Sequence, residues 1–130
     1  MRAPLVAVLL LAALARADAP DGGAPKKPLR ELGELTLLYF RADWCASCKR
    51  FDASGAMATV QQRLPRLAVQ KVNVDTEKAR VERYGVEYTP TLVLVDADGF
   101  PLARPKVDLD DGPATAERVL KAVKKSTGQP

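Results

Sequence analysis

One stretch of the sequence decides how this chain folds: LTLLYFRADWCASCKRF, residues 35–51. Its first part is a run of mostly apolar residues, which predicts a buried β-strand from Leu35 to Arg41. A helical pattern follows, and the predicted helix begins at Cys45. Backbone N–H groups at a helix N-terminus carry a partial positive charge, which stabilises a thiolate there. Because Cys48 follows about one helical turn later, the pair is predicted to form a reversible disulfide.

The spacing of the two cysteines indicates redox chemistry rather than a structural crosslink. They are the only cysteines in the sequence, and a bond between them closes a very small loop. Such a bond restricts the unfolded chain little, so it stabilises the fold little. A zinc site is disfavoured because the sequence has no histidine and no second pair of cysteines. We therefore expect a redox site with no bound metal or cofactor.

Residues 1–17 are predicted to be a secretory signal peptide. They comprise a short basic start, an apolar block, and small residues around a cleavage point after Ala17. The apolar block is shorter than the roughly 20 residues that span a bilayer. Cleavage after Ala19 is the second choice, and the alternatives to a signal peptide are an uncleaved membrane anchor or a frayed N-terminal helix. After cleavage we expect no stable membrane insertion, and a protein that is periplasmic or secreted.

The remainder of the sequence is predicted to form one domain. Residues 18–28 are rich in proline, glycine and charge, which predicts a flexible linker, and residues 29–130 are long enough for one core. Removal of residues 1–17 deletes Arg2 and Arg16 and leaves 18 basic against 16 acidic side chains, a net charge of +2. No basic cluster interleaved with aromatic residues indicates a nucleic-acid partner. A monomer is the default expectation for this size.

Hydrophobic periodicity predicts an α/β fold for this domain. The predicted strands cover residues 35–41, 67–74, 90–95 and 100–104, and the predicted helices cover 45–64, 77–84 and a segment after Gly112-Pro113 with Ala116, Val119, Leu120 and Val123 on one face. Ser54-Gly55 is expected to interrupt or bend the first helix. Strand 90–95 is aliphatic enough to be buried on both faces. This order predicts an α/β sandwich whose central mixed sheet has about four strands.

The Trp-Cys-x-x-Cys-Lys string of residues 44–49 and the Thr89-Pro90-Thr91 step together resemble the thioredoxin superfamily over about residues 35–125. Within it, residues 39–45 and Phe51-Asp52 look most like the C-terminal periplasmic reductase domain of the DsbD family. The resemblance implies a thioredoxin-like three-layer sandwich, in which helices flank the sheet.

The resemblance also implies roles for residues outside the cysteine motif. It implies that Thr89-Pro90 is a cis peptide bond packed against the cysteines, and that the backbone of Thr89 pairs with a bound substrate segment. The sequence alone equally allows Pro90 to open a strand in trans. Lys71 falls where thioredoxins place a lysine beside a buried acid under the active site.

That buried acid is missing, because its position is occupied by Tyr39. Asp52 is a candidate substitute, since Cys45, Cys48 and Asp52 share one stripe of the predicted helix. The alternative is a solvated Asp52 that pairs with Lys49. A second departure is residues 106–108, Lys-Val-Asp, where thioredoxins usually have a glycine in the loop that faces the cysteines.

Cys45 is the expected nucleophile, and Trp44 beside it is expected to form an apolar docking lip, or to serve as a core or edge aromatic. Cys48 then attacks the mixed disulfide and releases reduced substrate. Ala46-Ser47 supplies no histidine between the cysteines, so we expect a mid-range to reducing dithiol, nearer to thioredoxin than to a strong oxidant.

The sequence therefore predicts an exported thiol–disulfide oxidoreductase, a reductase of protein disulfides. Its expected partners are disulfide-bonded protein substrates and a separate membrane protein that donates electrons. Two alternatives remain: a specialist reductant for one target, such as apocytochrome c, and a thioredoxin-fold binding or holding module whose dithiol is incidental.

Overall fold

The computed structural model describes residues 30–128. Its elements are, in chain order, the 3-10 helix η1 (Leu32–Glu34), β1 (Thr36–Arg41), α1 (Ala46–Ala53), α2 (Ala56–Arg63), β2 (Ala68–Asn73), α3 (Lys78–Tyr84), β3 (Thr91–Val95), β4 (Pro101–Ala103) and α4 (Gly112–Thr127). The strands form one sheet in the order β2-β1-β3-β4. Strand β1 pairs parallel with β2 and antiparallel with β3, and β3 pairs antiparallel with β4. The predicted mixed sheet is thus confirmed.

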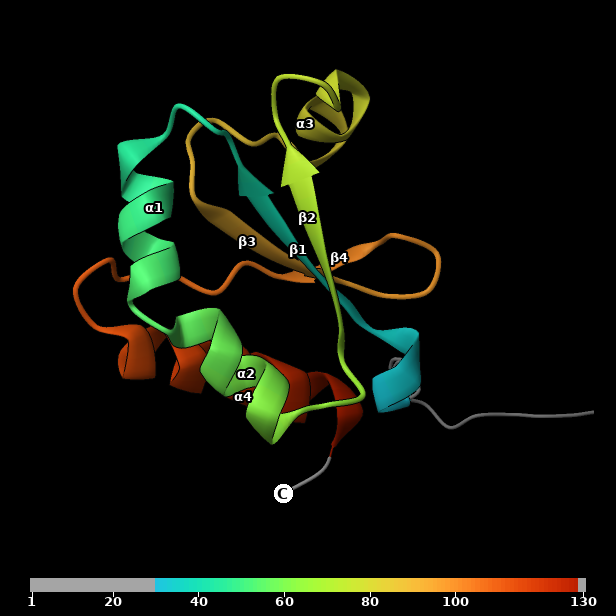
Figure 1. Cartoon of the computed structure of the whole chain (residues 1–130). Helices are drawn as coiled ribbons and strands as arrows, with labels where there is room; N and C mark the ends of the chain where they lie inside the picture. The colour runs from blue at the N-terminus through green and yellow to red at the C-terminus, as the bar shows by residue number, and fades with distance from the viewer. Residues whose placement is uncertain (1–29, 129–130) are drawn as a thin grey trace, which may run out of the picture.

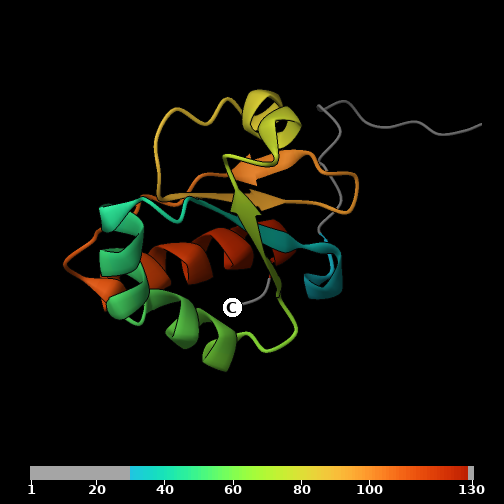
Figure 2. The ribbon, with the colours of Figure 1, turned by 45° about the horizontal axis from the view of Figure 1, so that its top comes forward.

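Helices cover both faces of the sheet and make three layers. Figures 1 and 2 show α2 and α4 on one side and α3 on the other, with α1 at one end of the sheet. The larger core joins β1 and β3 to α1, α2 and α4, and the smaller core joins the opposite face to α3. The predicted three-layer sandwich is therefore confirmed.

Strand β1 shows why this sequence forms the centre of the sheet. Its side chains alternate between the two cores, with Leu37 and Tyr39 on the larger and Leu38 and Phe40 on the smaller. All four are buried, and burial of each such side chain stabilises the fold by about 1.5–3 kcal/mol. Strand β3, the other central strand, is buried at every position, as its aliphatic sequence predicts.

The predicted interruption of the first helix lies at Ser54-Gly55. Helix α1 ends at Ala53, and Gly55 then takes a left-handed φ of 78°, which favours glycine, before α2 begins. The break redirects the chain from α1 into a helix that packs on α4. Gly112 at the start of α4 is also required, because a Cβ atom there would collide with the carbonyl oxygen of Ser54.

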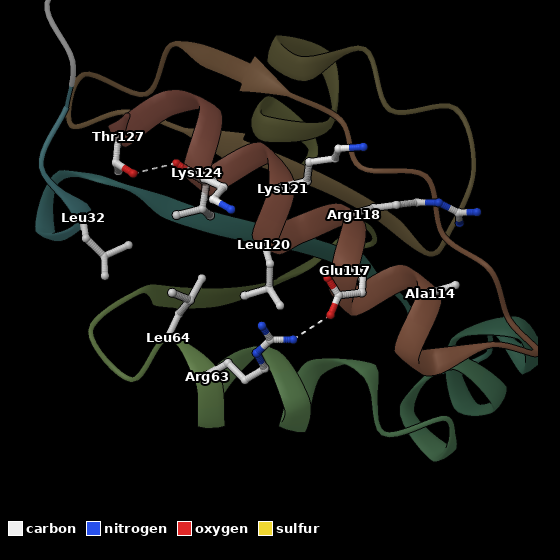
Figure 3. Close-up of a pocket in the computed structure, with 11 residues that line it drawn as sticks. Leu32, Arg63, Leu64, Ala114, Glu117, Arg118, Leu120, Lys121, Lys124 and Thr127 are labelled. Atoms are coloured by element: carbon white, nitrogen blue, oxygen red, sulfur yellow. Dashed lines mark hydrogen bonds and ion pairs between the residues drawn. The ribbon is translucent and has the colours of Figure 1, made fainter. Parts of the chain in front are cut away.

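Helix α4 begins with a side-chain cap, since Asp111 accepts a hydrogen bond of 2.9 Å from the backbone N–H of Ala114. Its buried face includes Ala116, Val119 and Val123. Leu120, expected on the same face, is only half-buried and lines a groove between α2 and α4 instead (Figure 3).

The predicted signal peptide, residues 1–17, and linker, residues 18–28, lie outside the described residues. Within residues 30–128, no helix combines the length and the hydrophobicity that crossing a bilayer requires.

Candidate active site

Cys45 caps the N-terminus of α1 at the edge where β1 ends. Its backbone is extended, and its Sγ accepts a hydrogen bond of 3.0 Å from the backbone N–H of Cys48. The two cysteines form a disulfide, with their Cα atoms 5.2 Å apart. Cys45 is 4% exposed and Cys48 is 0% exposed. An attacking reagent therefore reaches Cys45 before Cys48.

The loop before β3 supplies a second donor to Cys45. The Thr89-Pro90 peptide bond is cis, as the resemblance implies, and Pro90 is buried. The Thr89 hydroxyl donates a hydrogen bond of 3.1 Å to Cys45 Sγ, and the Thr89 carbonyl oxygen lies 3.7 Å from the same sulfur. A reduced Cys45 thus faces two donors, the Cys48 N–H and the Thr89 hydroxyl, which favour its thiolate form.

Trp44 lies beside the disulfide with 69% of its surface exposed. Its indole Nε1 donates a hydrogen bond of 2.9 Å to Oδ2 of Asp75, which follows strand β2. Because β1 and β2 are parallel, the residues after both strands meet at one edge of the sheet. Asp75 thus holds the exposed ring, and the role of Trp44 as a docking lip stays a prediction.

A polar network lies beneath Cys48. The Tyr39 hydroxyl donates its hydrogen bond to Asp52 Oδ1 at 2.9 Å and also lies within reach of the carbonyl oxygen of Cys48, at 3.3 Å. On the other side of the carboxylate, Arg41 Nη2 lies 3.7 Å from Asp52 Oδ2. Tyr39 and Arg41 are two residues apart on β1 and so face the same side of the sheet.

Burial raises the pKa of Tyr39 well above its ordinary value, and the hydrogen bond to Asp52 raises it further. Tyr39 is therefore a neutral hydrogen-bond donor at ordinary pH and cannot replace a carboxylate as a base. The carboxylate that accepts the Tyr39 hydrogen bond is Asp52, whose side chain is 40% exposed. Water therefore reaches one side of it.

Two of the predicted supporting residues lie outside this network. Lys49 is exposed, and Asp52 pairs with Arg41 rather than with Lys49. Lys71 lies opposite Tyr39 in the pairing of β2 with β1, but its side chain is exposed and takes part in no ion pair among residues 30–128. The role of Lys71 beside the acid of the site stays a prediction, and the cation that pairs with Asp52 is Arg41.

Sequence reasoning missed both Arg41 and Asp75. The alternation of side chains along β1 could have identified Arg41, since it places Arg41 on the same face of the sheet as Tyr39. No local pattern connects Asp75 to Trp44, which are 31 residues apart.

A groove that we call the active-site groove runs beside the disulfide. Ser47 and the loop of Tyr88, Thr89 and Pro90 line one part of it, and the segment from Arg104 to Val107 lines another. The segment that departs from the thioredoxin pattern, residues 106–108, therefore contributes Lys106 to this groove. Within residues 30–128, no cluster of three or more histidine, cysteine or acidic residues could hold a metal ion.

Comparisons with known proteins agree with this geometry. The family model described as Thioredoxin matches residues 26–125. The chain is 35% identical to a thioredoxin of Chlamydia caviae over 46% of its own length, and it spans only 57% of that relative.

Among solved structures, a thioredoxin of Fasciola hepatica superposes with a TM-score of 0.56 at 21% identity, over 72% of this chain and 82% of that one. A mutant thioredoxin of Halobacterium salinarum superposes with a TM-score of 0.52 at 30% identity, over 72% of this chain and 75% of that one. The closer likeness to the DsbD family is not tested by these matches and stays a prediction. By its family model, its fold and its paired cysteines, the chain belongs to the thioredoxin family.

Proposed function

We propose that this protein is an exported thiol–disulfide oxidoreductase that reduces disulfides in other proteins. The observation that carries the proposal is the environment of Cys45, whose sulfur caps α1 and accepts hydrogen bonds from Cys48 N–H and the Thr89 hydroxyl. Both donors favour the thiolate, which is the nucleophile in thiol–disulfide exchange.

The reaction takes two exchanges. In the first, the Cys45 thiolate attacks a substrate disulfide, that bond breaks, one substrate sulfur leaves as a thiolate, and a mixed disulfide forms. In the second, Cys48 loses its proton and attacks Cys45 Sγ, which releases the other substrate sulfur and forms the Cys45–Cys48 bond. The substrate gains two electrons, and the protein loses them.

The proton of Cys48 needs an acceptor, since this thiol is buried. Asp52 lies one turn beyond Cys48 on α1 and is the carboxylate of the network beneath it. The Tyr39 hydroxyl joins Asp52 to the backbone of Cys48, so it fixes the position of the carboxylate. In the proposed mechanism Asp52 accepts the proton through solvent, and Tyr39 is a positioning residue.

The direction of electron flow follows from how strongly the fold favours the thiolate over the disulfide. Ala46 and Ser47 stand between the cysteines, so no imidazolium lowers the thiol pKa as in strong oxidants. We therefore expect a reducing pair. Equilibration against glutathione buffers measures the potential, and a value near about −120 mV, the strong-oxidant end of the scale, would contradict a reductase.

Export and the electron donor belong to the same proposal. They rest on the signal-peptide pattern of residues 1–17 and on the resemblance to the periplasmic domain of the DsbD family. In this scheme a separate membrane protein reduces the Cys45–Cys48 bond after each turnover. Fractionation of cells that make the full chain tests export, and recovery of the protein in the cytoplasm would contradict it.

The Cys48→Ser variant tests the function directly, because it stalls the reaction at the mixed disulfide. We expect it to capture disulfide-bonded proteins through Cys45 in a complex that dithiothreitol releases. The matched control is Cys45→Ser/Cys48→Ser, which should capture none. Full biological activity in that double variant would instead identify a binding module.

A further inference from the structure

Helix α4 carries a surplus of positive charge on its exposed face. Among its charged residues, Arg118, Lys121, Lys124 and Lys125 are basic, and Glu117 is the one acid. Glu117 is already paired, because its Oε1 lies 2.6 Å from Arg63 Nη1, as the dashed line in Figure 3 shows. The four cations of α4 form no ion pair among residues 30–128.

Two grooves with apolar floors flank this cationic helix. The α2–α4 groove of Figure 3 contains Leu32, Leu64 and Leu120. The α4–β4 groove, on the other flank, has Leu102, Ala103, Pro105 and Ala122 in its floor. Its cationic residues are Arg30, Lys106, Arg118, Lys121 and Lys125, and no carboxylate is among its lining residues. Within residues 30–128, only Arg30 of these five has a carboxylate partner, Asp96 at 3.3 Å.

The α4–β4 groove adjoins the active-site groove. Pro105 and Lys106 line both, so the two grooves meet at these residues. Arg118 Nη1 donates a hydrogen bond of 3.2 Å to the carbonyl oxygen of Lys106, which ties this junction to α4. A chain that leaves the disulfide past Thr89 and Pro90 would therefore reach the cationic groove by way of Pro105 and Lys106.

We propose that the α4–β4 groove binds an acidic segment of the protein substrate, next in sequence to the disulfide that Cys45 attacks. The inference rests on the proposed reductase function and names its substrate class. Carboxylates of the segment meet Lys106, Lys121 and Lys125, and its apolar side chains cover the floor. The protein has a net charge of only +4, so the expected preference for acidic segments comes from where the cations lie rather than from their total.

A peptide segment fits this surface better than an anionic membrane does. Side chains that insert into a bilayer project from the surface, but here the apolar residues form the floors of grooves. The large exposed hydrophobic residues of the described chain are Trp44, Tyr88 and Phe100, and none of them belongs to α4. A flat bilayer would touch the cations and leave the floors uncovered, whereas a chain reaches both.

The test compares reduction of two peptides and a small disulfide by the pre-reduced full chain. The peptides carry the same disulfide, flanked by glutamate and leucine in one and by glutamine and leucine in the other. Hydroxyethyl disulfide carries no peptide segment, so its rate of reduction measures the activity of the redox site alone. We expect the acidic peptide to react about tenfold faster than the neutral peptide, with a smaller ratio at high salt.

Charge-reversal variants then test which residues cause the faster reaction with the acidic peptide. The variant Lys121→Glu/Lys125→Glu should react equally with both peptides and keep its rate on hydroxyethyl disulfide. The matched control Arg66→Glu/Lys78→Glu changes the net charge equally at exposed residues that line none of these grooves, and it should keep the preference.

Three outcomes would overturn the inference. Equal rates of the unmodified chain on both peptides, with hydroxyethyl disulfide reduced, would refute the acidic-segment site and leave the reductase standing. No reduction of hydroxyethyl disulfide would refute the reductase and the site together. Cosedimentation with phosphatidylglycerol vesicles that Lys121→Glu/Lys125→Glu abolishes, together with no peptide preference, would assign α4 to membranes instead.

Discussion

The two cysteines are neighbours on one helix turn, yet they meet different surroundings. The region around Cys45 consists of backbone and a loop threonine: the Cys48 N–H and the Thr89 hydroxyl both point at its sulfur. The region beneath Cys48 consists of side chains, with Tyr39, Asp52 and Arg41 in one network. The first region keeps the pattern that the thioredoxin resemblance implies, and the second departs from it. In the proposed mechanism, activation of Cys45 is thus separate from proton transfer at Cys48, and substitutions in the side chains beneath Cys48 would change only the proton transfer.

The largest effect should come from replacing each cysteine singly by serine. Cys45→Ser should lose disulfide exchange entirely, because a serine hydroxyl is not ionised at ordinary pH and cannot attack. Cys48→Ser should still release one substrate thiol per molecule and then stop. Stopped-flow measurement of thiol release, with a chromogenic disulfide, checks both. Thiol release by Cys45→Ser in the first turnover would contradict the assignment of the nucleophile.

Asp52→Asn should slow the second exchange and leave the first unchanged. We expect a loss of about tenfold, below the usual range for a general base, because the side chain is 40% exposed and water can take its place. Rapid-quench analysis of the mixed disulfide separates the two steps. The matched control is Asp43→Asn, since Asp43 Oδ1 lies 3.2 Å from the same Arg41 but its side chain is 84% exposed. Equal slowing in both variants would remove Asp52 from the mechanism.

Tyr39→Phe should lower the free energy of unfolding by about 1–2 kcal/mol, because a buried hydroxyl and its hydrogen bonds are lost while the ring stays. Urea denaturation monitored by circular dichroism gives this value. Tyr88→Phe is the control, since Tyr88 is exposed and its change should stay below about 0.5 kcal/mol. Equal losses would show that the network beneath Cys48 adds no stability.

The raised pKa of Tyr39 also predicts how stability depends on pH. A group that binds its proton more tightly when folded contributes stability that is complete below its unfolded pKa, about 10 for tyrosine, and is lost as the pH rises above that value. The free energy of unfolding should therefore fall more steeply above about pH 10 in the unmodified chain than in Tyr39→Phe. Parallel curves would contradict a buried, neutral Tyr39.

The smallest effect should follow from Asp75→Ala, which frees the indole of Trp44. Because this hydrogen bond lies at the surface, we expect a stability loss of less than about 1 kcal/mol. Trp44 is the only tryptophan of the chain, so its fluorescence anisotropy should fall as the ring gains freedom. The control Glu82→Ala, an exposed change on α3, should leave the anisotropy unchanged. An unchanged anisotropy in Asp75→Ala would contradict the contact.

The sequence was sufficient wherever structure follows from a local pattern. The burial of β3 on both faces follows from its aliphatic run, and the break between α1 and α2 follows from Gly55, which takes a left-handed φ. The helix start at Cys45 follows from the change of pattern after β1. Each of these features involves residues close together along the chain.

The sequence was insufficient where distant segments meet. The contact of Arg41 with Asp52 forms because α1 packs over the end of β1. The hydrogen bond between Trp44 and Asp75 forms because β1 pairs with β2. Lys71 lies opposite Tyr39 in the sheet, but its exposed side chain on an edge strand follows from the strand order, which no local pattern predicts. The contribution of Lys106 to two grooves requires the chain to return along α4, which no local pattern predicts.

The rates at which the two thiols of the reduced protein react with iodoacetamide measure the contrast between their surroundings most directly. Mass spectrometry of the digested protein resolves the label on Cys45 from that on Cys48. Cys45 is 4% exposed and faces two donors, while Cys48 is 0% exposed, so we predict that Cys45 reacts at least about tenfold faster near neutral pH. Equal rates, a faster Cys48, or two inert thiols would contradict the account.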